Sequence, residues 1–117
     1  MNVNALIKAA LDPFGDPVEY GAYVGAAETY YVFNGSTLGS DYGDDEPGHE
    51  RHLVQVHFFC PLKVDALIRQ KRTKQALFAA GFTWPSMIDA TDTESRHYVF
   101  ECEYVAGVDV DGDDEES

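Results

Sequence analysis

The sequence has little cysteine, few cations and no long hydrophobic run. Its 117 residues include two cysteines, Cys60 and Cys102, too few for the disulfide framework of a small secreted domain. No run approaches the roughly 20 apolar residues of a membrane-spanning helix, and residues 1–11 lack the apolar core of a signal peptide. Eight Lys and Arg stand against 21 Asp and Glu, a net charge of −13. The few cysteines argue against a small secreted domain, and the lack of a long apolar run argues against a membrane protein. The negative charge argues against general nucleic-acid binding, because phosphate repels such a protein.

Motifs for catalysis are also missing. The sequence contains no nucleophile motif, phosphate loop or dinucleotide fingerprint. Its four histidines lack the tight spacing with either cysteine that a zinc site requires, although His57 and His97 fall on outward strand faces and can approach each other. The carboxylates Asp44, Asp45 and Glu46 have no histidine or lysine beside them, and general acid–base catalysis needs positioned groups. We therefore expect no enzymatic activity, cofactor or metal.

What is present is one ordinary globular core. Hydrophobic residues make up 44% of the chain and aromatic residues 13%, which predicts a single domain over residues 1–106. Six of the 21 acidic residues lie in the last eleven positions, in a segment almost without large apolar groups. This composition predicts that residues 107–117 form a disordered acidic tail.

The hydrophobic pattern predicts an α+β fold. Asn2 or Asn4 can cap a first helix, and Pro61 and Gly81 bracket a second one. Apolar residues at period two, with β-branched and aromatic side chains, predict four strands. The expected order is helix Val3–Leu11, strands Val18–Val24, Glu28–Asn34 and Arg51–Cys60, helix Val64–Ala80, connection Phe82–Ser95 and strand Arg96–Ala106. We expect a small, mostly antiparallel four-stranded sheet with both helices on one face, mixed if the crossover makes the last pair parallel.

The strands also predict what the domain buries. Alternation places two rows in the core: Val54, Val56, Phe58 and Cys60, and Tyr98, Phe100, Cys102 and Tyr104. In the second helix, Leu67, Ile68, Leu77, Phe78 and Ala80 are expected to form the apolar side. The second face of the strand Arg51–Cys60 mixes apolar and polar residues, Leu53, Gln55, His57 and Phe59. Such a face favours cover by a partner over exposure to water.

Two charged segments stand out. The loop Gly35–Glu50, opened by the turn signal Asn34-Gly35, carries five acids and no Lys or Arg, and a loop of this length tends to be functional or disordered. The second helix region holds five of the eight cations: Lys63, Arg69, Lys71, Arg72 and Lys74. Opposite charges on one molecule predict head-to-tail docking of copies, which can close a ring. The alternative is that both segments only solubilise the protein.

The order of elements resembles the tail-completion or tail-to-head joining proteins of long-tailed bacteriophages. The resemblance covers Met1 to Tyr104. It rests on the first helix, on Pro17-Val18 with an aromatic-rich strand, and on five later segments. These are Thr29–Asn34, the acidic loop ending Asp44–Pro47, Leu53–His57, the helix end Leu77–Phe82, and His97–Tyr104.

The resemblance implies a structural virion protein with a fold similar to that of tail terminators. Such proteins form a hexameric ring, cap the tail tube, and join it to the head connector or stopper protein, while genomic DNA passes through as cargo. The expected location is the head–tail junction, and the host cytoplasm during assembly. The loop Leu38–Glu50 would dock on neighbours and become ordered there. The connection Phe82–Ser95 would provide a second contact, with Trp84 as its anchor or, alternatively, as part of the core.

The candidate interaction residues therefore come from the acidic loop, the basic helix and the second connection. They are Asp41, Tyr42, Asp44, Asp45, Glu46, Arg69, Lys71, Arg72, Lys74 and Trp84. Two other functions stay open on the sequence. One is a head-completion or minor tail protein at a neighbouring position. The other is a small acidic inhibitor that mimics DNA and blocks a host nuclease.

Overall fold

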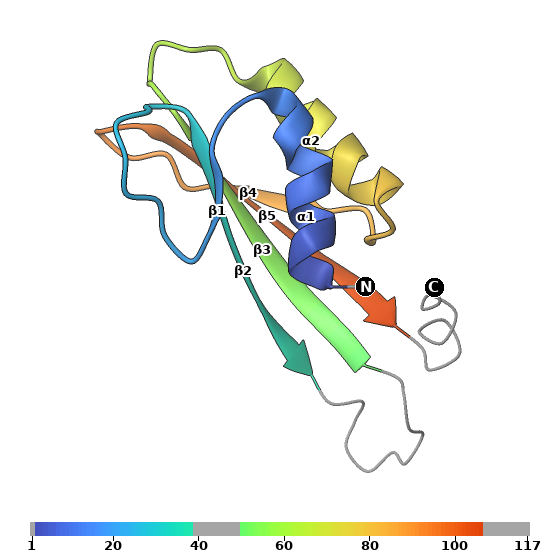
Figure 1. The fold of residues 1–117 in the computed structure, drawn as a ribbon. Coiled ribbons are helices and arrows are strands. Elements are labelled where there is room, and N and C mark those ends of the chain that lie inside the picture. The colour runs from blue at the N-terminus through green and yellow to red at the C-terminus, as the bar shows by residue number, and fades with distance from the viewer. Residues whose placement is uncertain (1, 39–49, 107–117) are drawn as a thin grey trace.

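The computed structural model describes residues 2–38 and 50–106 (Figure 1). Its elements in chain order are α1 (Val3–Leu11), a 3-10 turn (Asp12–Phe14), β1 (Val18–Tyr20), β2 (Tyr30–Leu38), β3 (Glu50–Cys60), α2 (Leu67–Ala79), β4 (Ser86–Asp89) and β5 (Arg96–Ala106). The acidic loop around Asp41, Tyr42, Asp44, Asp45 and Glu46, and the predicted tail 107–117, lie outside the described residues.

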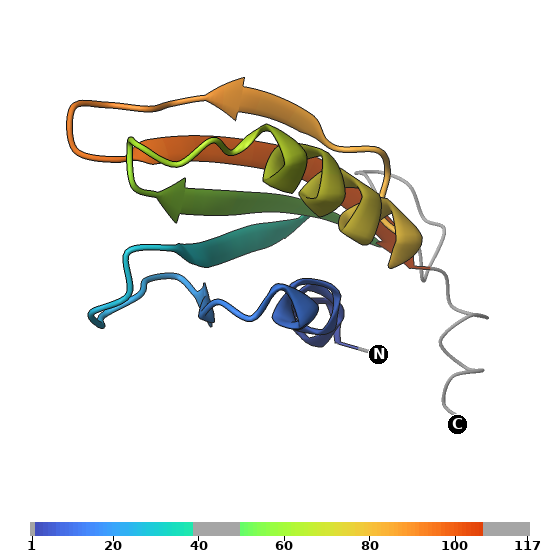
Figure 2. The ribbon, with the colours of Figure 1, turned by 90° about the horizontal axis from the view of Figure 1, so that it is seen from above.

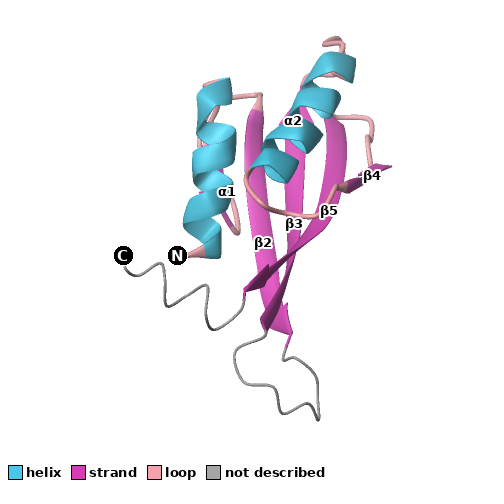
Figure 3. Ribbon diagram, turned by 90° about the vertical axis from the view of Figure 1, so that its right-hand side faces the viewer, coloured by secondary structure: helices cyan, strands magenta, loops and turns pink. Residues whose placement is uncertain are grey.

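The strands form one five-stranded sheet in the order β1-β2-β3-β5-β4. β1 pairs parallel with β2, and the other neighbours are antiparallel. Both helices pack on the same face: α1 lies over the β1–β2 side and α2 over the β3–β5 side (Figures 2 and 3). The predicted α+β class is confirmed, but the parallel alternative for the last strand pair is wrong. β4 is the unexpected fifth strand, within the connection predicted at Phe82–Ser95.

The first helix forms as predicted. Oδ1 of Asn2 accepts hydrogen bonds from the backbone N–H groups of Asn4 at 2.8 Å and Ala5 at 3.4 Å, which satisfies donors that have no partner within the helix. Ile7 and Leu11 are buried against the sheet. Pro13, in the 3-10 turn, then prevents the helix from continuing.

The second helix begins later than predicted and buries a different side. It starts at Leu67, where Oδ1 of Asp65 accepts a hydrogen bond from the Leu67 N–H at 3.0 Å. Thr73 and Leu77, four residues apart, are its buried residues. Leu67, Ile68 and Phe78 were expected in the core but are 56%, 64% and 55% exposed. The expectation fails because polar Thr73 occupies the inward row, where Tyr31 satisfies it.

The core lies between the helices and the inward face of the central strands. The predicted inward rows of β3 and β5 are confirmed from Val54 to Cys60 and from Tyr98 to Cys102, and Tyr104 is partly buried against them. Tyr31 and Phe33 of β2 complete the inward face, and Phe82 fills the space after α2. The predicted burial of both cysteines is confirmed, and both are free thiols.

Two strand boundaries differ from the prediction. β1 ends at Tyr20 instead of Val24, since Gly21 takes a φ of 83°, and Val24 is 95% exposed. β2 does not end at Asn34 but continues through Gly35 to Leu38. A Cβ at Gly35 would lie 2.7 Å from the carbonyl oxygen of Leu53, so this glycine permits close approach of β3 instead of forming a turn.

Neither helix of the described residues is long and apolar enough to span a membrane.

Candidate functional site

The sheet has one face that no described helix covers, and we call it the open face (Figure 3). Because side chains alternate along a strand, the residues opposite the core rows point to it. Its central members are half-buried, and all but Asn34, Gln55 and the acids are apolar, aromatic or histidine. They are Tyr30, Val32 and Asn34 of β2, Leu53, Gln55, His57 and Phe59 of β3, and His97, Val99, Glu101 and Glu103 of β5.

One end of the open face is a row of stacked rings. Tyr30 stacks on Phe59 with centroids 4.8 Å apart, and Phe59 stacks on His97 at 4.2 Å. Nε2 of His97 then lies 2.8 Å from Nδ1 of His57, so the predicted approach of these histidines is confirmed. Tyr23 extends the row at the other end, 4.6 Å from Tyr30. A shallow groove of about 420 Å³ runs along these rings.

Both histidines of the pair have a lowered pKa, which favours neutral rings at pH 7. Burial lowers the pKa of His57, and the charge of His97 lowers it further. Burial also lowers the pKa of His97, although Asp92 and Asp89 act in the opposite direction. One ring therefore donates the shared proton and the other accepts it. The described residues contain no group of three or more His, Cys, Asp or Glu side chains that could hold a metal ion.

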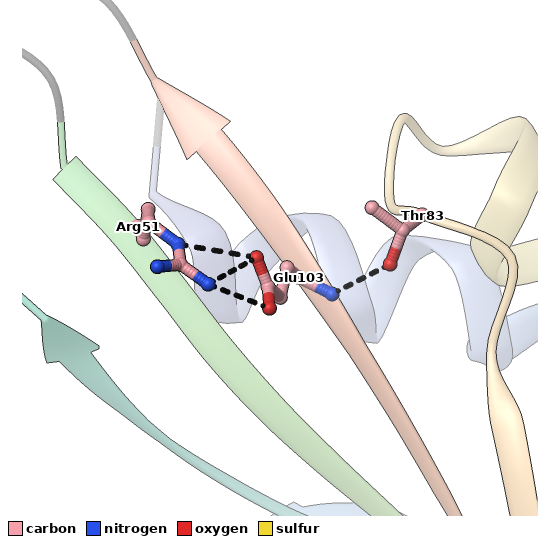
Figure 4. Close-up of polar contacts among 3 residues, drawn as sticks. All are labelled: Arg51, Thr83 and Glu103. Atoms are coloured by element: carbon pink, nitrogen blue, oxygen red, sulfur yellow. Dashed lines mark hydrogen bonds and ion pairs between the residues drawn. The ribbon is translucent and has the colours of Figure 1, made fainter.

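The other end of the open face is polar. The guanidinium of Arg51 binds both carboxylate oxygens of Glu103 through Nη2, at 3.1 and 3.0 Å (Figure 4). The backbone N–H of Glu103 donates to Oγ1 of Thr83 at 3.0 Å, which fastens the chain before β4 to β5. Nε2 of Gln55 donates to Glu101 at 2.8 Å. A groove of about 640 Å³ crosses this region, bordered by Trp84, Ser86, Glu101 and Glu103.

Trp84 stands at the edge of the sheet. Its side chain is 54% exposed, and its ring meets Phe78 of α2 edge to face at 5.5 Å. The alternative placement of Trp84 in the core is therefore wrong. An exposed aromatic pair beside a groove has the character of an interface anchor.

The structure divides the predicted basic residues. Arg69 turns inward: Nη1 lies 2.8 Å from Oδ2 of Asp16, and the guanidinium lies over the rings of Phe14 and Phe58 at 4.9 and 5.0 Å. Arg69 therefore holds α2 to the core, and its part in an interface stays a prediction. The exposed Lys71 and Arg72 and the half-buried Lys74 lie on α2, across the sheet from the open face.

The alternation of β3 indicated one strand of the open face, but its full extent was missed. The residues that β2 and β5 add become neighbours only through the register, in which Tyr30 pairs with Phe59, and Phe59 with His97. Alternation along each strand shows which of its side chains share a face. The pairing between strands 30 to 40 residues apart did not follow from it.

The two cysteines of the described residues are not activated as nucleophiles. Burial raises the pKa of Cys60 and raises that of Cys102 to about 12, so neither is a thiolate nucleophile at neutral pH. The histidines of the open face bond to each other instead of activating a hydroxyl or thiol.

Comparison with known proteins adds fold similarity only. No family model and no curated protein matches the chain. Among the solved structures, one superposes with a TM-score of 0.60, covering 89% of this chain and 92% of that chain at 13% sequence identity. At this identity the likeness concerns the fold alone.

Proposed function

We propose that this chain is a structural protein of a bacteriophage tail. It completes the end of the tail, assembles with copies of itself into a ring, and joins the tail tube to the head connector. The observation that carries the structural role is the open face: rings and aliphatic side chains of three strands lie side by side, and no helix or strand among residues 2–38 and 50–106 covers them. A contiguous apolar surface of this kind marks an interaction site. The phage assignment rests on the resemblance in the order of elements.

The charge of the chain supports the same role. A ring at the head–tail junction surrounds the genome as it passes. With 21 acidic and 8 basic residues, the protein repels phosphate, so DNA slides past without adhering. Four cations still lie on or just before α2, available for acidic neighbours.

Removal of the gene from the phage tests this proposal. We expect virions without the protein to appear in electron micrographs as DNA-filled heads and separate tails, and purified protein to restore joined particles. Joined, infectious particles in the deletion strain would overturn the tail-completion role. Binding to DNA-filled heads but not to tail tubes would instead assign a head-completion role.

The single tryptophan reports docking directly. Because Trp84 is half-exposed in the free chain, its fluorescence should shift to shorter wavelength when purified tail tubes are added. Trp84→Phe removes the signal while keeping an aromatic ring, and serves as the matched control. A host nuclease recovered with the protein, together with no response to tail tubes, would favour the DNA-mimic inhibitor.

A further inference from the structure

We infer that the open face binds the outer face of α2 from a second copy of this chain. The outer face is the exposed side of the helix, formed by Leu67, Ile68, Lys71, Arg72, Gln75 and Phe78. The inference rests on the proposed function, since it names the surfaces through which copies would associate. In this inference the basic helix docks on the open face, and not on the acidic loop as the sequence predicted.

The apolar parts of the two surfaces match. On α2, Leu67, Ile68 and Phe78 are each more than half exposed, which leaves a ridge of large side chains without cover. On the sheet, the ring row at Tyr30 and Phe59 supplies an apolar floor. Burial of such surface is the main favourable term in protein association, and the three helix side chains stay more than half exposed even though Phe78 meets the ring of Trp84.

The charges match as well. Four cations make neither an ion pair nor a side-chain hydrogen bond with any described residue, and all lie on α2 or just before it: Lys63, Lys71, Arg72 and Lys74. On the open face, Glu101 has Gln55 as its hydrogen-bond partner and no cation among the described residues. Opposite charges at the two surfaces favour encounter and fix the register of docking.

The spacing of these groups agrees. Ile68 and Arg72 are one helical turn apart, about 6 Å along the axis. Val99 and Glu101 point to the same face of β5 about 7 Å apart. An α2 helix laid along β5 can therefore place an aliphatic side chain on Val99 and a guanidinium on Glu101 at the same time. The helix of 13 residues spans about 20 Å, within the roughly 36 Å length of the 11-residue β3 and β5.

The two surfaces lie on opposite sides of the sheet, since α2 packs on the face away from the open face (Figures 2 and 3). Each copy therefore offers one donor and one acceptor surface, a heterologous contact that continues from copy to copy and can close a ring. A symmetric pairing of two open faces would instead place Glu101 of both copies, which has no cation partner among the described residues, in one interface. Like charges at an interface are costly, which disfavours that arrangement.

Charge exchange between the surfaces tests the inference. Glu101→Lys reverses the acceptor, and the double variant Lys71→Glu/Arg72→Glu reverses the donor. Each variant alone should associate at least about tenfold more weakly than wild type. An equimolar mixture should regain association, since the acidic helix of one variant meets the basic sheet of the other. Self-association is measured by sedimentation velocity up to millimolar protein, and by cross-linking on purified tail tubes.

The controls reverse charges away from both surfaces. Glu94→Lys changes the β4–β5 turn and Lys8→Glu changes α1, and both should associate like wild type. Circular dichroism and urea midpoints establish that every variant is folded. Association that survives either reversal, a mixture that fails to regain it, or a wild type that stays monomeric in both assays overturns the inference. The open face would instead bind a different basic protein if only Glu101→Lys weakened association and a basic peptide competed with the association of wild type.

Tail joining is scored separately. If wild-type protein restores joined particles but charge exchange has no effect on association, the proposed function stands and the inferred surfaces are wrong. If the mixture regains association but wild-type protein never joins tails to heads, the surfaces stand and the proposed function is wrong.

Discussion

His57 on β3 and His97 on β5 form a direct hydrogen bond across neighbouring strands, with Nδ1 of His57 2.8 Å from Nε2 of His97. Two charged imidazoles cannot share this geometry, because each would present an N–H to the other. The contact therefore depends on at least one neutral ring, and both rings have a lowered pKa for which burial is the first cause.

The pair makes stability depend on pH. An unfolded histidine titrates near its ordinary value of 6.5, while the folded rings take up protons only at lower pH. The stabilisation is complete above pH 6.5 and is lost as pH falls through the lowered pKa values, because the unfolded chain then binds more protons. We expect the free energy of unfolding to fall on acidification through this range, and the fall to be smaller in His57→Gln/His97→Gln. Urea titrations at several pH values measure it.

The matched control is Ile88→Ala, which shortens an exposed side chain of β4 and removes no titratable group. It should keep the wild-type slope of stability against pH between neutral and mildly acidic conditions. Equal slopes for wild type and the double variant would show that the histidine pair does not contribute.

Arg69 should matter more than the other cations of α2. Its guanidinium pairs with Asp16 and lies over two aromatic rings, with 27% of the side chain exposed. Removal leaves the mostly buried Asp16 carboxylate without its partner and the rings without their cation. We expect Arg69→Ala to lower the free energy of unfolding by about 2–3 kcal/mol. Exposed Arg72→Ala should change it by less than about 0.5 kcal/mol. Equal small losses in urea unfolding would refute the inward role of Arg69.

A second polar contact ties α2 to β2. The hydroxyl of Thr73 donates to the Arg69 carbonyl at 2.7 Å, so Tyr31 donates to Thr73, also at 2.7 Å. Thr73→Val strips the buried Tyr31 hydroxyl of this acceptor, and we expect a loss of about 1–3 kcal/mol. Tyr31→Phe removes the donor but leaves Thr73 bonded to the backbone, so its cost should be smaller, about 1 kcal/mol. Thermal or urea unfolding that reverses this order contradicts the assigned direction.

The two thiols should react only when the domain opens. Cys60 and Cys102 are 1% and 5% exposed, and burial raises the pKa of both, that of Cys102 to about 12. Since the thiolate is the reactive form, labelling by a disulfide reagent at pH 8 should be slow in the native protein and rapid in urea. An introduced surface cysteine, Glu94→Cys, provides the fast reference. Rapid labelling of both native thiols without denaturant would contradict their burial.

The sequence allowed prediction where local chemistry decided the structure. α1 follows from Asn2 at its start and Pro13 after its end, and the inward rows of β3 and β5 follow from alternation. The four-residue β4 was missed because only Met87 of it is partly buried, so it has no alternating pattern to detect. It becomes a strand through its pairing with β5, in which Ile88 opposes Val99.

Prediction failed where tertiary contacts overrode local pattern. Leu67, Ile68 and Phe78 looked like the inward side of α2, but Arg69 and Thr73 take that position because Asp16 and Tyr31 satisfy them. The ring row of the open face could not be predicted from the sequence for a related reason. It depends on the pairing of distant strands, and periodicity along one strand does not determine that pairing.

The sheet ends in its two shortest strands, β1 with three residues and β4 with four. An extended chain that tried to pair with β1 or with β4 would find few backbone groups to bond. Brief edge strands are a recognised protection against fibrillar aggregation. Long β-ladders are confined to the interior of the sheet, between β2, β3 and β5. If copies gather in an assembling particle, as the proposed function requires, these short edge strands would favour contacts between faces over growth along the edges.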